Sequence, residues 1–112
     1  MGINRLGELE ELVVLAVAGL GDNAYGVPIR NRLVKLADRR VPFGAIYAIL
    51  NRLERKSFLE SHVGGATKER GGRRKKFYKL TDAGMTALEE SREIRDSMWR
   101  EIDAIKLEGS PA

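Results

Sequence analysis

The segment from Gly64 to Lys76 places the strongest constraint on this chain, because it is too rich in glycine and charge to enter a hydrophobic core. It separates Phe58–Val63 from Phe77–Leu80, and the β-branched or aromatic residues and rough alternation of these two stretches predict β-strands. Two strands joined by such a segment form a β-hairpin with a long basic tip. The core must therefore come from the flanking parts of the chain.

Three short helices are predicted before the hairpin. Apolar residues recur at three- and four-residue steps from Gly7 to Gly19, from Tyr25 to Asp38 and from Phe43 to Lys56. Pro28 fits the first turn of the second helix, where a missing N–H costs nothing. The side of the third helix that we expect to face the core carries Phe43, Ile46, Leu50 and Leu53.

A fourth helix is predicted after the hairpin, with Thr81 as its N-cap, Asp82 in its first turn and an end near Leu107. A helix of about 25 residues spans about 37 Å, which is longer than so small a core can cover. The four-then-three spacing of its apolar residues is typical of a coiled-coil seam. We therefore expect a homodimer, with an interface made by Leu9, Leu88, Met98, Trp99, Ile102 and Ile105.

The second and third helices, joined by a tight connector, match a helix-turn-helix, and the hairpin after them makes it a winged helix. The expected fold class is mainly α with a small β-hairpin. We expect one compact unit, in which residues 1–81 form a winged helix-turn-helix, residues 82–108 form a dimerisation helix and residues 109–112 form a disordered tail.

Charge is distributed unevenly along this chain of net charge +4. Residues 25–56 carry eight basic and two acidic side chains, and residues 64–79 carry seven and one. Residues 1–24 carry one basic and four acidic side chains, and residues 82–108 carry four and eight. Two basic stretches between acidic ends predict a face for a polyanion, with nucleic acid as the first candidate and a merely solvated charged face as the alternative.

The solvent side of the third helix carries groups that can read base edges. At 100° per residue, Gly44, Asn51 and Arg55 fall opposite the apolar side, with Arg52 beside them and Tyr47 at the boundary. Tyr47 could reach a phosphate or a thymine methyl. The hairpin tip can follow a phosphate strand or enter a minor groove. Its expected DNA contacts are Lys68, Arg70, Gly71, Gly72, Arg73, Arg74, Lys75 and Lys76.

Several functional classes are excluded. The chain has no cysteine and a single histidine, His62, so no metal centre or conventional triad is expected. Neighbouring acids such as Glu10 and Glu11 point to different sides of a helix, so the sequence supports neither an enzyme nor a cofactor. The longest apolar run, Leu12–Leu20, is about half of the roughly 20 residues that a membrane span needs. We expect a cytoplasmic protein.

Nearly the whole chain resembles the PadR family of bacterial winged-helix transcriptional regulators, in its compact subfamily with a single C-terminal helix. The resemblance is carried by the segments Leu6–Glu10, Asp22–Ile29, Gly44–Glu54, Glu69–Thr81 and Ala83–Gly84. It implies a homodimeric repressor that binds a palindromic operator near its own promoter, often near a transporter or detoxification gene. In some members a small molecule releases the DNA.

The resemblance also implies roles for single residues. The major groove would be contacted by Tyr47, Asn51 and Arg52. Tyr25 and the wing residues would contact the DNA backbone or the minor groove. Trp99 resembles the aromatic residue that lines a cavity between subunits in multidrug-sensing members. The wing residues implied at the backbone or minor groove are Arg70, Arg73, Arg74 and Lys75.

Two features depart from the family pattern. Ser57 stands where a glycine commonly follows the third helix, and the charged residues Arg95 and Arg100 flank Trp99. Trp99 could therefore anchor the interface or line a pocket for a flat aromatic effector.

The sequence thus predicts a sequence-specific DNA-binding regulator, a homodimeric repressor of its own or a neighbouring operon that a small aromatic ligand could release. The alternative is a winged helix that senses a ligand or docks a protein without binding a specific operator. An RNA-binding module is a third possibility, against which the scarcity of aromatic residues counts.

Overall fold

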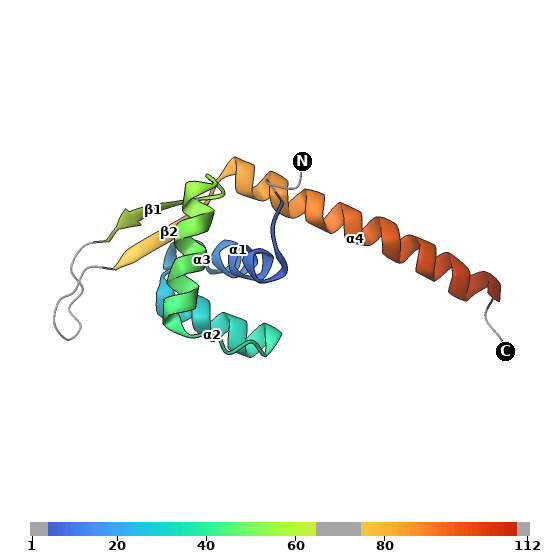
Figure 1. The fold of residues 1–112 in the computed structure, drawn as a ribbon, viewed down its shortest axis with the longest axis horizontal. Helices are drawn as coiled ribbons and strands as arrows, with labels where there is room; N and C mark the ends of the chain where they lie inside the picture. Colours follow the sequence, from blue (N-terminus) through green and yellow to red (C-terminus); the bar gives the residue numbers. More distant parts are fainter. Residues whose placement is uncertain (1–4, 65–74, 110–112) are drawn as a thin grey trace.

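A computed structural model describes residues 5–64 and 75–109 of the chain. The predicted fold class and order of elements are confirmed: helices before and after a small antiparallel hairpin (Figure 1). The predicted hairpin-tip residues 68–74 and the tail residues 110–112 lie outside the described residues. The elements are α1 (Glu8–Leu20), the 3-10 helix η2 (Gly21–Asn23), α2 (Gly26–Ala37), α3 (Phe43–Arg55), β1 (Leu59–Val63), β2 (Lys76–Leu80) and α4 (Asp82–Gly109).

The hydrophobic core is centred on α1. Its valines Val13, Val14 and Val17 are almost fully inaccessible to solvent, and α2, α3 and the hairpin pack around them. Apolar burial of this kind stabilises a fold by about 25 cal/mol for each Å² removed from water. The largest buried side chains contributed by the other elements are Ile29, Ile46, Leu50, Leu53 and Leu59.

The hairpin is anchored to the helical core. Its strands pair in the register that runs from Leu59 opposite Leu80 to Val63 opposite Lys76. The Tyr78 N–H donates to the carbonyl oxygen of Ala24 at 2.8 Å, which ties β2 to the turn after α1. Strand alternation buries Tyr78 and leaves its neighbour Phe77 half-buried, as expected.

The long helix α4 begins tightly packed and then leaves the core. The Gly84 N–H donates to the Thr81 hydroxyl at 3.0 Å, which confirms the predicted N-cap. A Cβ at Gly84 would lie 2.2 Å from the Phe58 carbonyl oxygen, so only glycine allows α4 to approach this closely. Within α4 the buried residues are Gly84, Ala87 and Leu88.

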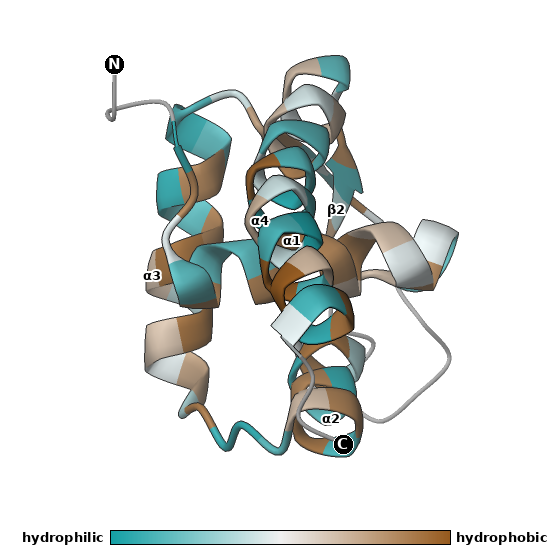
Figure 2. Cartoon of the chain, turned by 90° about the vertical axis from the view of Figure 1, so that its right-hand side faces the viewer, coloured by the Kyte–Doolittle hydropathy of each residue, from teal (hydrophilic) through white to brown (hydrophobic). Residues whose placement is uncertain are grey.

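Beyond Leu88 no residue of the helix is buried, Arg95 still pairs with Glu11 of α1, and the helix continues away from the core to Gly109, one residue past the predicted 82–108 (Figure 1). Figure 2 shows hydrophobic and hydrophilic residues interspersed along this projecting part. The projection stretches the described chain to 63 × 31 × 22 Å with a radius of gyration of 17.4 Å, against about 13 Å for a compact chain of this length. In the described residues no helix is long and apolar enough to cross a membrane.

One core prediction was wrong. Phe43, expected to face inward with Ile46, is 38% exposed, and Ile49 is buried in its place. Phe43 is the first residue of α3, beyond the part of the helix that lies over the α1 core, so its ring packs sideways on Tyr47 and Arg30.

The residue after the C-cap of α3 is strained. Ser57 has φ 67°, in the left-handed region that a Cβ disfavours by about 1–2 kcal/mol. We expect Ser57→Gly to raise the free energy of unfolding by about 0.5–1 kcal/mol and Tm by about 2–6 °C. Thermal unfolding followed by circular dichroism measures both. Ser57→Ala keeps the Cβ and should give no gain; equal stabilisation by both variants would contradict the assigned strain.

Candidate nucleic-acid interface

The outward face of α3 is shallow. Gly44, Ala45 and Ala48 are exposed along it, and a Cβ at Gly44 would meet no atom within 4 Å. The predicted readers Asn51 and Arg55 are exposed on the C-terminal half of the same helix. Small side chains let a helix backbone come close to the floor of a major groove, which is wide enough to admit one helix.

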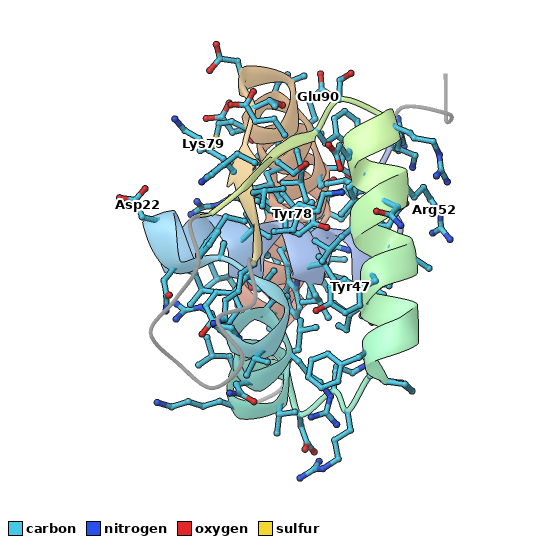
Figure 3. The ribbon with its side chains drawn as sticks, turned by 90° about the vertical axis from the view of Figure 1, so that its left-hand side faces the viewer. Asp22, Tyr47, Arg52, Tyr78, Lys79 and Glu90 are labelled. Atoms are coloured by element: carbon cyan, nitrogen blue, oxygen red, sulfur yellow. The ribbon has the colours of Figure 1, made fainter. Side chains whose placement is uncertain are left out.

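Tyr47 leaves α3 on the side of α2, whereas Arg52 points away on the opposite side (Figure 3). A Cβ at Gly26 would lie 2.2 Å from the Tyr47 hydroxyl oxygen, so a glycine is required at the start of α2 to accommodate this ring. The ring stacks on Phe43 with a centroid separation of 6.3 Å. Tyr47 therefore offers solvent part of its ring, while its hydroxyl lies against α2.

Arg52 is held back toward α1. Its Nη1 lies 3.5 Å from Oε2 of Glu10, and Nζ of Lys56 lies 3.1 Å from the same oxygen. Glu10 also accepts a hydrogen bond of 2.8 Å from the Gly7 N–H at the start of α1. Glu10 is 7% exposed, so the three partners of its carboxylate replace most of its hydration. This cluster fixes α3 against α1 and leaves half of the Arg52 side chain exposed.

The pKa of Glu10 follows from these contacts. Burial raises this pKa, but the Gly7 N–H, Lys56 and Arg52 together outweigh burial and hold it below the ordinary value of 4.5. The carboxylate is therefore charged at neutral pH. Sequence reasoning considered Glu10 only as one of two adjacent acids, because its partners on α3 lie more than 40 residues away.

A second acidic residue joins α3 to the wing. Glu54 accepts a 2.6 Å hydrogen bond from the Ser61 hydroxyl of β1, and its other oxygen lies 3.4 Å from Nζ of Lys76 on β2. The Ser61 hydrogen bond lowers the pKa of Glu54, partial burial opposes that effect, and Lys76 lowers the pKa further. The predicted phosphate contact Lys76 is thus already oriented by a carboxylate, and the hairpin is held at a set angle to α3.

The loop end of the hairpin brings together two other predicted contacts. Tyr25, the N-cap of α2, meets the ring of Phe77 edge-on with centroids 5.3 Å apart. Nζ of Lys75 lies 5.2 Å from the Tyr25 ring centroid. His62 stacks on the Phe77 ring at 5.6 Å, so one aromatic cluster supports this cation. In residues 5–64 and 75–109 no three acidic or histidine side chains gather as metal ligands.

The expected dimer residues of α4 form a separate surface. Met98, Trp99, Ile102 and Ile105 are between 44% and 67% exposed in the single chain, whereas Leu88 is buried in the core and Leu9 is partly buried against it. A groove of about 510 Å³ runs between α1 and α4. An ion pair between Glu11 of α1 and Arg95 of α4 lies in it. Its apolar lining includes Leu15, Met85 and Trp99.

Comparison with known proteins decides the family. Residues 14–90 match the model of the transcriptional regulator PadR-like family, a span from the first helix to the packed start of α4. The chain belongs to this PadR-like family. Members of the family are transcriptional regulators. No match was found among curated proteins.

Solved structures similar to this PadR-like chain include a PadR family transcription regulator from Clostridium difficile. The two chains are 26% identical with a TM-score of 0.64, and the match covers 94% of this chain and 100% of that one. A PadR-like transcription factor from Bacteroides fragilis has 27% identity and a TM-score of 0.70, with coverage of 87% of this chain and 88% of that one. A PadR-like regulator from Bacillus cereus, at 23% identity and a TM-score of 0.68 over 87% and 89% of the two chains, shows the same fold.

The buried carboxylate of this PadR-like chain yields a stability test. Glu10→Gln keeps the shape but removes the charge facing Lys56 and Arg52, so we expect a loss of about 1–3 kcal/mol at pH 7 in urea unfolding. Because the folded pKa is lowered, the carboxylate contributes fully above about pH 4.5, and this contribution disappears as the pH falls through the folded pKa. The free energies of unfolding of wild type and Glu10→Gln should therefore converge as the pH is lowered.

Glu8→Gln is the matched control. Glu8 pairs with Arg39 at 3.0 Å, but its side chain is 72% exposed. Such surface pairs contribute about 0–1 kcal/mol, so its removal should change stability much less. A loss for Glu10→Gln that stays constant from pH 7 to pH 3 would contradict the charge-based account.

Proposed function

We propose that this chain is a sequence-specific regulator of double-stranded DNA that acts in the cytoplasm as a homodimeric repressor of its own or a neighbouring operon. The observation that carries this proposal is the shallow outward face of α3, with Asn51 and Arg55 exposed on it and a basic hairpin beside it. That combination suits a helix lying in a major groove while cations contact the flanking phosphates. Membership of a family of transcriptional regulators supports it.

The contacts divide by chemistry. Asn51 and Arg55 can form hydrogen bonds with base edges, and the half-exposed Arg52 offers a further guanidinium group on the side of α1. Tyr25 and Lys75 at the loop end of the hairpin, with Lys76 and the basic tip residues, contact the phosphates. Phosphate contacts add affinity without sequence preference, and each lowers the salt exponent of binding by about 0.9. The tip contacts we propose are Lys68, Arg70, Gly71, Gly72, Arg73 and Arg74.

The dimer is proposed from α4. In the single chain, the large apolar side chains between Ile94 and Leu107 are 42% to 85% exposed. A second copy packed along this face would bury Met98, Ile102 and Ile105 in the alternating spacing of a helix pair. Such a pair places two copies of α3 on one duplex, so the operator is palindromic.

The groove beside Trp99 favours a regulatory ligand. Its lining combines the exposed indole with apolar side chains and the Glu11–Arg95 ion pair. A flat aromatic compound stacked on Trp99 would change how α4 meets α1 and the second copy. We propose that such a compound releases the DNA.

Binding of the DNA upstream of the chain's own coding region, against random duplex of equal length, tests the central proposal. We expect about 10³-fold tighter binding to the upstream DNA. Ala48→Glu places a carboxylate in the middle of the outward face of α3, where phosphates and base acceptors repel it. We expect this variant to lose at least 100-fold in affinity with no change in Tm.

Ala83→Glu is the control, because Ala83 is an exposed alanine in the first turn of α4. It should bind as wild type does. The ligand-sensing or protein-docking alternative would be favoured by two results together: equal affinity for upstream and random duplex, and no preferred sequence in a selection from a random pool. An Ala48→Glu variant that binds normally would move the interface away from α3.

Sedimentation of α4 variants tests the dimer. Ile102→Glu puts a charge into the proposed seam, so we expect monomers at concentrations where the wild type is dimeric. Ala104→Glu lies on the opposite side of the helix at 100° per residue and should stay dimeric. A dimeric Ile102→Glu variant would place the interface elsewhere.

The same pair of variants separates the two roles of Trp99. A flat aromatic dye bound in the groove between α1 and α4 should quench Trp99 fluorescence in wild type, in Ala104→Glu and in monomeric Ile102→Glu. Quenching lost only in monomeric Ile102→Glu would place the effector site between subunits. Absence of quenching across a panel of such dyes would leave Trp99 as an interface anchor only.

A further inference from the structure

The N-terminal half of α3 is poor in side-chain hydrogen-bonding groups. Its exposed residues are Phe43, Gly44, Ala45, Tyr47 and Ala48, and the only polar side-chain atom among them is the Tyr47 hydroxyl. That hydroxyl lies against Gly26 at the start of α2. In helix-turn-helix proteins this end of the recognition helix contacts base edges, so any base discrimination here must be apolar.

The ring of Phe43 is held in place on two sides. The guanidinium carbon of Arg30 lies 4.9 Å from its centroid, and the Tyr47 ring stacks at 6.3 Å with an angle of 26° between the planes. Arg30 is itself fixed, because its Nε donates to the Val41 carbonyl oxygen at 3.0 Å. A large apolar side chain that is 38% exposed therefore packs against two neighbours, one of which is itself held by a hydrogen bond.

The major-groove edge of a base pair presents one apolar group, the thymine 5-methyl. We propose that Phe43, backed by Tyr47 and Arg30, contacts a thymine methyl and so sets the sequence preference at the N-terminal end of α3. Gly44 and Ala48 leave room for the ring to approach, since neither side chain extends beyond a methyl group. This inference rests on the proposed DNA-binding function and assigns a specificity determinant within it.

Arg30 and Tyr47 act as positioning residues in this arrangement. They orient the ring, while its exposed part contacts the methyl. Removal of the methyl should cost about fourfold in affinity, the value of one buried methyl group. Removal of the Phe43 ring should abolish this difference without affecting the readout by Asn51 and Arg55 at other base pairs.

The experiment uses a duplex selected from a random pool by the full-length protein. Each thymine of the selected duplex is replaced singly by deoxyuridine, which deletes only the methyl, and Kd is measured for wild type, Phe43→Ala, Phe43→Leu and Leu36→Ala. We expect wild type to lose about fourfold at one position in each half-site, Phe43→Ala to lose nothing there, and Phe43→Leu to retain part of the loss. Leu36→Ala, a truncation of a more exposed apolar residue on α2, should behave as wild type.

The outcomes separate this inference from the function on which it rests. A selected duplex that outcompetes random DNA, but shows the same uracil sensitivity in wild type and Phe43→Ala at every thymine, would overturn the inference and leave the DNA-binding function standing. A selection that yields no preferred duplex would overturn the proposed function, and the inference with it. The comparison of uracil with thymine is made within each variant, so a general weakening by Phe43→Ala does not affect it.

Discussion

The first turn of α1 carries the constraint on which the arrangement of the other helices depends. A carboxylate removed from water must regain its lost hydration from charged or hydrogen-bonding partners. Glu10 does so by engaging Arg52 and Lys56, which determines where α3 lies. Its neighbours extend the pattern: Glu8 pairs with Arg39 of the connector before α3, and Glu11 pairs with Arg95 of α4. Three acids in one turn thus contact three separate parts of the chain.

The periodic parts of the fold could be predicted from sequence because helix period and strand alternation are local properties. Thr81 was recognised as a cap for the same reason, since its bond to Gly84 spans three residues. Phe43 was misplaced because a helical wheel gives the direction of a side chain but not where the neighbouring core ends. The partners of Glu10 and Glu54 could not be read from sequence, since charge pairing over long separations depends on how the helices pack.

The interface on α3 divides into two chemically different halves. Toward the C-terminus it offers an amide and guanidinium groups, and toward the N-terminus it offers two aromatic rings and small residues. The two carboxylates that hold the helix both act on the C-terminal half: Glu10 pairs with Arg52, and Glu54, which belongs to this half, pairs with Lys76 of β2. The fold therefore supplies rigidity to the polar half by ion pairs and to the apolar half by ring stacking.

The close contact of Gly84 with the Phe58 carbonyl gives α4 the properties of a lever. The part of the helix beyond this point is about 37 Å long, so a tilt of 5° about Gly84 would displace its far end by about 3 Å. That displacement approaches the 3.4 Å rise of one base pair. In the proposed dimer, a small change in packing beside α1 would thus be converted into a change in the distance between two DNA-reading helices comparable to a step along the duplex.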